Sequence, residues 1–236
     1  MMNFRTQFNL YATPPHECSY LSGRQATTIF IDPHFPKDKA LYSTLSQHGF
    51  RRSGEHLYRP HCHSCDACVP VRIPVCFFEP NRTQQRIWRK NQDLVVKAVA
   101  GGFREEHFQL YSRYLAARHA GGGMDNPTRH SYMQFLTSSW AETIFYEFYL
   151  QDELIIVAVV DHFEQGLSAV YTFFNPDYPK RSLGVYAVLW EIEECKRLRK
   201  EALYLGYWIK NCQKMSYKVN YQPLEYYRHG LWQPKP

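Results

Sequence analysis

The stretch TIFYEFYLQDELIIVAVVDHFEQGLSAVYTFFN, residues 143–175, decides the fold of this chain. It contains three runs rich in β-branched and aromatic residues, at 143–150, 153–162 and 167–175, and such runs are typical of strands. Only short turns separate them. Because connections of this length join antiparallel neighbours, we expect an antiparallel meander.

The elements that follow place this meander in a mixed fold. Residues 183–201 have the pattern of a long helix, and residues 203–207 (LYLGY) read as a further strand. The acyltransferase fold of the histone and aminoglycoside acetyltransferases has this order of elements, although many α+β domains share it. We predict an α+β protein with a mostly antiparallel central sheet.

The residues before the meander predict shorter elements. Asn81 has the position and chemistry of a helix N-cap. A glycine turn at 121–123 separates two of the expected helices. The expected strands are 26–31, 69–75 and 94–100, and the expected helices are 36–48, 82–91, 105–119 and 129–138.

Composition and charge bear on the cellular compartment of the chain and on its partners. Its 236 residues carry a net charge of +6, which is compatible with a polyanionic partner and equally with none. No apolar run approaches the ~20 residues that cross a bilayer, and the start of the chain does not resemble a signal peptide. Seven cysteines, an odd number, fit reduced thiols better than a disulfide framework. We expect a soluble cytosolic protein that uses no membrane.

The sharpest local motif is Cys62-x2-Cys65-x2-Cys68, flanked by histidines. Three thiolates at this spacing can coordinate one soft metal ion. A closed structural site needs a fourth ligand, which would be Cys18, Cys76 or a flanking histidine. The alternative is a tight turn of free thiols.

A cationic stripe is expected on the helix at 82–91. Spacings of four and three bring Arg82, Arg86 and Arg89 onto one face, and Lys90 follows directly. A phosphate backbone is the natural partner of such a stripe. A merely solvated face is the alternative.

The start of the long helix, Arg181-Ser182-Leu183-Gly184-Val185-Tyr186, offers a third motif. Acetyltransferases of this fold bind the pyrophosphate of coenzyme A on exposed amides at such a turn. Arg181 and Gly184 match their pattern, whereas Tyr186 stands where a small residue is wanted. We interpret this as an acyltransferase scaffold whose donor is not coenzyme A. An ordinary glycine near a helix start is the alternative.

Together these segments resemble the arginyl-tRNA–protein transferase family, in particular its short bacterial branch, whose members transfer leucine. The resemblance runs from about residue 10 to residue 230. The matching segments are HECSYL (16–21), HGFRRSG (48–54), YRPHCHSCDACVPVRI (58–73), the arginine helix, SLGVY (182–186), YLGYWI (204–209) and MSYK (215–218).

The resemblance implies transfer of leucine from leucyl-tRNA to proteins that begin with Asp or Glu, which marks them for degradation. It also implies a cysteine-containing N-terminal domain (1–100) packed on an acetyltransferase-like domain (101–236). Arginine transfer, which eukaryotic members perform, is one alternative. Others are a coenzyme A-dependent N-acyltransferase and a metal-stabilised RNA-binding module.

An aminoacyl ester is already activated, so attack by an α-amine needs positioning rather than a covalent nucleophile. On this view Arg72 pairs with the acidic side chain of the acceptor, because guanidinium binds carboxylate bidentately; a structural salt bridge within the chain is the alternative. Asp161 orients the incoming amine. Tyr171, Tyr186 and Gly184 line the pocket for the aminoacyl-adenosine.

The remaining roles concern the tRNA and a cofactor. The cations of the stripe would hold the tRNA acceptor stem. Eukaryotic members can hold zinc or an iron–sulfur cluster, with a second cysteine close after the one that matches Cys18; here Ser19-Tyr20-Leu21 follows Cys18. The candidate metal ligands in this chain are Cys18, Cys62, Cys65 and Cys68.

Overall fold

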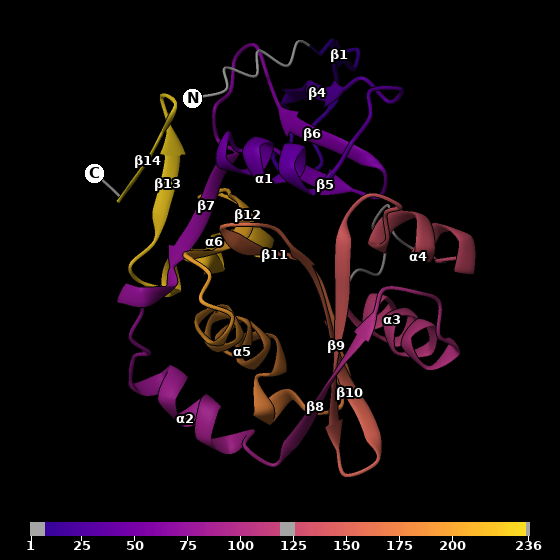
Figure 1. Cartoon of the computed structure of the whole chain (residues 1–236), viewed down its shortest axis with the longest axis vertical. Helices are drawn as coiled ribbons and strands as arrows, with labels where there is room; N and C mark the ends of the chain where they lie inside the picture. Colours follow the sequence, from indigo (N-terminus) through magenta and orange to yellow (C-terminus); the bar gives the residue numbers. More distant parts are fainter. Residues whose placement is uncertain (1–7, 119–125, 235–236) are drawn as a thin grey trace.

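The computed structural model describes residues 8–118 and 126–234. Its main feature is an eight-stranded sheet that curves around helix α5 (Leu183–Arg197), with α3 (Glu105–Arg118) and α4 (Arg129–Leu136) on the outer face (Figure 1). Its strand order is β14-β13-β7-β12-β11-β10-β9-β8, and only the pair β11 and β12 is parallel. The predicted α+β fold with a mostly antiparallel sheet is confirmed.

The predicted meander is present as β9, β10 and β11, with both turns where the sequence places them. The strands of the sheet are β7 (Val69–Pro74), β8 (Leu94–Ala100), β9 (Glu142–Leu150), β10 (Glu153–His162), β11 (Gly166–Phe174), β12 (Ala202–Trp208), β13 (Glu225–Arg228) and β14 (Leu231–Pro234).

Alternation along β10 explains why helices cover both faces of the sheet. Ile156, Ala158 and Val160 pack into the core beneath α5. Val157 and Val159 pack into a second core with α3 and α4. Since successive side chains of a strand point to opposite faces, an uninterrupted apolar strand requires cover on both sides.

The N-terminal region forms a smaller layer at one end of the large sheet (Figure 1). It contains a four-stranded sheet, a two-stranded hairpin and helix α1, and its core includes Tyr42 and Leu57 together with Phe163 and Tyr204 of the large domain. Its elements are β1 (Leu10–Ala12), β2 (His16–Glu17), β3 (Gln25–Ala26), β4 (Thr28–Ile31), α1 (Lys39–Gln47), β5 (Arg51–Ser53) and β6 (His56–Pro60).

The structure does not divide the chain at residue 100. Strands β7 and β8 precede that position, yet both are hydrogen-bonded members of the large sheet. Helix α2 (Arg82–Lys90) connects them and packs against α5. The layer that stands apart from the large sheet ends with β6, because backbone ladders join every later strand into one sheet.

Most of the expected helices and strands are present within one to three residues of their predicted ends. The long helix is the main exception, because it ends at Arg197 rather than at residue 201. There the backbone N–H of Lys200 reaches back to the carbonyl of Cys195, and Arg199 adopts a φ of 54°. This is a Schellman ending. Because Arg199 occupies the position where glycine is usual, no glycine marks the end of this helix in the sequence.

Two further expectations concern the glycine turn and the membrane. The glycine turn at 121–123 lies outside the described residues. Across 8–118 and 126–234, none of the helices is long and apolar enough to cross a membrane.

Candidate active site

The parallel pair β11 and β12 separates after a short contact. Their ladder ends at Ser168 and Tyr204, although both strands continue for several residues. Each strand also has an irregular register against its other neighbour, opposite Val159/Val160 and at Tyr204/Gly206. The strands therefore leave an opening whose edges carry backbone groups with no ladder partner across the gap.

Arg51 of β5 lies in this opening. Its guanidinium donates to the Ser168 hydroxyl (2.7 Å) and to the carbonyls of Ala169 (2.6 Å) and Tyr204 (3.3 Å). It thus satisfies carbonyls on both separated strands. Gly206, at a φ of +79°, permits this approach, since a Cβ there would lie 3.2 Å from the Arg51 Nε.

Helix α5, which carries Glu191, packs against both β11 and β12. Glu191 is fully buried, and neither of its carboxylate oxygens has a hydrogen-bond partner among the residues that the structure describes. Burial raises the pKa of Glu191 from 4.5 to about 8, and the nearby Arg51 charge opposes that rise. Glu191 and Arg51 therefore sense each other's charge without forming an ion pair.

The short segment α6 (Gln213–Ser216) and η3 (Tyr217–Asn220) closes the opening toward solvent. Tyr217 is 44% exposed, but its hydroxyl is enclosed, and burial together with the Glu191 carboxyl raises its pKa to about 12. The hydroxyl of Tyr114 from α3 adds to this rise, so the two rings are neighbours. An aromatic mouth therefore lies above Glu191.

Lys218 is buried beside this mouth. Its ammonium donates to the carbonyl of Tyr207 and lies 3.8 Å from the sulfur of Met215. Burial, with the repulsion of Arg51, lowers the pKa of Lys218 from 10.5 to about 7. A lysine that is partly neutral near pH 7 can take up or release a proton.

The N-terminus of α5 carries free backbone donors but not the predicted pocket. Ser182 has a φ of 53° and its side chain does not cap the helix; its carbonyl accepts from the N–H groups of Val185 and Tyr186, which leaves those of Leu183 and Gly184 without an intrahelical partner. Gly184 is small because Phe174 packs on it; a Cβ would lie 3.0 Å from that ring. Arg181 is bound bidentately by Asp93 (2.8 and 2.9 Å).

The pocket prediction for Tyr186 is wrong. Tyr186 is buried in the core, with its ring against Trp88 of α2 (5.5 Å) and Phe148 of β9 (5.9 Å). It is the third residue after Leu183, and the turn of the helix points it inward toward the sheet and α2.

Helix α2 presents the predicted cationic stripe. Asn81 caps it with a reciprocal capping box. Arg82, Arg86 and Arg89 are exposed, and none of them forms an ion pair within the described part of the chain. Lys90 instead donates to the carbonyl of Lys180 (2.8 Å), which ties the end of α2 to the loop before α5.

Asp161 does not face the opening. Its carboxylate accepts two hydrogen bonds from Arg52 (both 2.7 Å), one from Thr143 (2.7 Å) and one from Tyr42 (2.9 Å). Both charged side chains are fully buried. Because its oxygens are engaged within the protein, the structure argues against the predicted role of orienting an amine. Asp161 joins β10 to the N-terminal layer.

Arg72 also has a partner within the chain. Its guanidinium donates to Glu225 (2.6 Å) and to the Tyr204 hydroxyl (3.1 Å), and it lies over the Trp232 ring (4.6 Å). Glu225 therefore occupies the place predicted for the acidic side chain of an acceptor.

Tyr171 of β11 is half-buried among rings of α3 and α4, 5.2 Å from Phe135 and 6.3 Å from Tyr114. Its hydroxyl has no hydrogen-bond partner in the described structure. It belongs to the aromatic wall on the outer face of β11, next to the mouth formed by Tyr114 and Tyr217.

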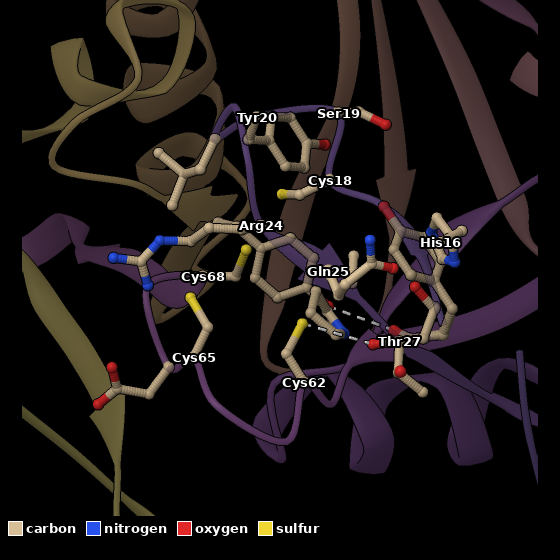
Figure 2. A pocket seen from close by; sticks show the side chains of 17 residues that line it. His16, Cys18, Ser19, Tyr20, Arg24, Gln25, Thr27, Cys62, Cys65 and Cys68 are labelled. Atoms are coloured by element: carbon tan, nitrogen blue, oxygen red, sulfur yellow. Dashed lines mark hydrogen bonds between the residues drawn. The ribbon is translucent and has the colours of Figure 1, made fainter. Parts of the chain in front are cut away.

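The four predicted metal ligands line one cavity of about 220 Å³ in the N-terminal layer (Figure 2). Figure 2 shows Cys18, Cys62, Cys65 and Cys68 with their sulfurs directed at this space. The backbones of Cys62 and Cys65 form an isolated antiparallel β-bridge, and both thiols are free. The Cys62 thiol lies 3.7 Å from the carbonyl of Thr27. The sequence thus identified the members of this cluster.

A fifth cysteine, Cys212, adds to the cluster. Burial raises the pKa of Cys68 to about 12, and the charges of Cys18, Cys62, Cys65 and Cys212 add to the rise. Soft thiol donors suit zinc or an iron–sulfur cluster. However, no group of three or more such ligands in 8–118 and 126–234 is close enough to hold an ion. As arranged, the side chains do not fit a closed metal site.

Sequence reasoning missed several of these residues, although signals existed for each. Arg51 and Lys218 lie in HGFRRSG and MSYK, two of the unusual segments. Glu191 stands at helical spacing from the buried Ala187 and Cys195, so a carboxylate was encoded on the apolar face of a helix.

Two separated strands beside a helix N-terminus, in a sheet of this topology, suit an acyl-group transferase, although a fold does not by itself determine a function. Models of the arginine-tRNA-protein transferase match its N-terminal part at residues 16–86 and its C-terminal part at residues 106–228. The chain belongs to the arginine-tRNA-protein transferase family, and it is therefore an enzyme that moves an aminoacyl group from tRNA to protein.

Individual relatives agree with this assignment. The chain is 54% identical over 226 residues to an aspartate/glutamate leucyltransferase of Pseudomonas fluorescens, and equally to one of Pseudomonas entomophila, with 96% of each chain covered. Among solved structures, the chain is similar to L-PGS from Bacillus licheniformis, with 10% sequence identity and a TM-score of 0.47. The superposition covers 72% of this chain and 50% of the L-PGS chain.

Proposed function

We propose that this enzyme transfers leucine from leucyl-tRNA to the α-amino group of proteins that begin with Asp or Glu. The observation that carries the proposal is spatial: α2, which carries the exposed arginines, packs on α5, and its Gln84 donates to the carbonyl of Asn220 in η3 (3.0 Å), the segment next to the opening between β11 and β12. A charged tRNA held on α2 could therefore place its 3′ end at the opening. The names of the relatives support leucine as the group transferred.

The proposed reaction is aminolysis of an ester. The neutral amine of the acceptor attacks the ester carbonyl, and the carbon–nitrogen bond forms as the bond to the ribose oxygen breaks. The ribose leaves with a proton that the attacking nitrogen loses. Backbone N–H groups on the free edge of β11 beyond Ser168 are suitable donors to the oxyanion, and each such donor is worth roughly 3 kcal/mol.

The tRNA would be held by charge and by backbone. Arg82, Arg86 and Arg89 offer sequence-independent phosphate contacts. The uncapped N-terminus of α5 adds a partial positive charge at the same end of the molecule. We place the reaction in the cytosol, because the seven cysteines are free thiols and persist in a reducing compartment.

The direct test is transfer of radiolabelled leucine, with arginine in parallel, from charged tRNA to peptides that begin with Asp, Glu or Ala. The proposal predicts leucine on the Asp and Glu peptides only. Arginine incorporation would overturn the choice of amino acid and keep the reaction type. Equal labelling of the Ala peptide would overturn the proposed acceptor specificity.

A further inference from the structure

Two ionisable side chains near the strand opening, Arg51 and Glu191, have no ion-pair partner among residues 8–118 and 126–234. Three buried or half-buried arginines of the described chain bind a carboxylate, namely Arg52, Arg72 and Arg181. Arg51 instead donates only to neutral oxygens. A guanidinium held in this way keeps an uncompensated charge and N–H donors suited to an incoming carboxylate.

Glu191 is the complementary case. An unpartnered carboxyl in a fully buried position costs stability, and apolar residues surround it on the same face of α5. Because burial raises the pKa of Glu191 to about 8, near-neutral conditions leave it poised between its two protonation states. A group of this kind, in a cleft and beside a specific charge, is typical of functional sites.

The opening gives a substrate a short path to this pair. Tyr217 is partly exposed, and its hydroxyl is close enough to Glu191 for the carboxyl charge to raise its pKa. Glu191 and the partly exposed Tyr217 therefore lie in the same part of the molecule, on elements that both contact β12. Only the first residue of an extended acceptor would have to enter.

We propose that Arg51 and Glu191 together recognise the first residue of the acceptor protein, Arg51 binding its side-chain carboxylate and Glu191 its α-ammonium. This inference rests on the proposed transfer to acidic N-termini. The signs of the charges fix the assignment, since an N-terminal Asp or Glu presents one anion and one cation only a few bonds apart. Asn or Gln in the same place would leave the charge of Arg51 unpaired.

Glu191 also has a chemical role in this scheme. Its carboxylate takes one proton from the α-ammonium and so produces the neutral amine that attacks the ester. The attacking nitrogen loses its second proton to the departing ribose oxygen. Glu191 releases its proton to solvent after the product leaves, so the cycle yields one amide, one uncharged tRNA and one proton.

Steady-state kinetics with leucyl-tRNA and peptides that begin with Asp or Asn test the role of Arg51. In Arg51→Gln we expect KM for the Asp peptide to rise about 100-fold, because a charge-assisted pair is lost, and the preference for Asp over Asn to collapse. Arg59→Gln is the matched control, since Arg59 lies over Phe50 outside the opening. Retention of the Asp preference by a folded Arg51→Gln would overturn the proposal.

Arg51 also supports two strands, so Arg51→Lys provides a second variant. It keeps the charge but cannot bind a carboxylate bidentately. We expect it to lose about 10-fold in kcat/KM for the Asp peptide and to leave the Asn peptide unaffected. Equal losses with both peptides would show that Arg51 acts on the fold alone and would overturn the proposed recognition.

Glu191→Gln tests the proton acceptor. We expect kcat to fall about 100-fold with KM for leucyl-tRNA unchanged, whereas Glu193→Gln on the exposed side of the same helix changes neither. Formate should partly restore kcat to Glu191→Ala, an effect that a structural carboxyl would not show. Wild-type kcat in folded Glu191→Gln would overturn this inference alone. A wild-type enzyme that transfers nothing would overturn the proposed function as well.

Discussion

The ion pair of Arg52 and Asp161 gives the sharpest test of a structural against a catalytic role. Asp161→Asn keeps the shape of the side chain and removes its charge. Arg52 then stays fully buried with a neutral amide in place of its counter-ion. Burial alone would lower the pKa of Arg52, and at present the charge and hydrogen bonds of Asp161 raise it overall.

The expected magnitude follows from that burial. Removing one partner of a buried ion pair costs about 3–5 kcal/mol. For a chain of this length the loss corresponds to roughly 10 °C in Tm. Urea unfolding measures the free energy, and the transfer assay at 20 °C measures kcat of the folded fraction. We expect a large loss of stability and a kcat close to that of the wild type.

Glu142→Gln is the matched control. Glu142 on β9 also pairs with the N-terminal layer, through Lys39 (2.5 Å), but both side chains are about half exposed. An exposed pair contributes less than about 1 kcal/mol. The reasoning fails if Asp161→Asn loses no more free energy of unfolding than Glu142→Gln and instead loses kcat, because Asp161 would then act on the substrate.

Three further predictions concern pH, tRNA and the cysteines. The pKa of Glu191 in the folded state lies above its unfolded value of 4.5, so its contribution to the free energy of unfolding declines as pH rises from 4.5 to 8. In urea titrations Glu191→Gln should therefore be more stable than the wild type above pH 8 and should match it below pH 4.5. The double variant Arg86→Ala/Arg89→Ala should raise KM for leucyl-tRNA and should reduce the slope of log K for tRNA binding against log salt concentration by about one unit per residue removed. Lys39→Ala should change neither quantity. An unchanged slope in the double variant would exclude α2 as the tRNA contact. The sequence motif predicts zinc or iron, whereas the thiols of the described residues are not close enough together to hold an ion; from this arrangement we expect elemental analysis to find neither metal in the purified wild type, and one metal per chain that is lost in Cys65→Ser would contradict the expectation.

The large-scale fold could be read from the sequence because its signals are local. The meander follows from strand runs separated by turns too short for any other connection, and Asn81 marks the start of α2 by its own capping chemistry. The cysteine cluster was also accessible, since Cys62, Cys65 and Cys68 are close in the chain and a tight loop keeps them close in space.

The active site was less accessible because its parts come from distant segments. Asp161 and Arg72 were chosen as free charges, yet Arg52 and Glu225 neutralise them from 109 and 153 residues away. Arg51 and Glu191 were passed over, although tertiary packing leaves both without a counter-ion.

The sequence by itself determined the class of fold, the thiol cluster, the basic helix and, through its unusual segments, the family. Only the tertiary structure decided which charges are satisfied and which remain available. The physical reason is that pattern and capping act over a few residues, whereas the electrostatic state of a buried group depends on every element packed around it. The opening between β11 and β12 exists only when α5, β5 and the two strands have come together.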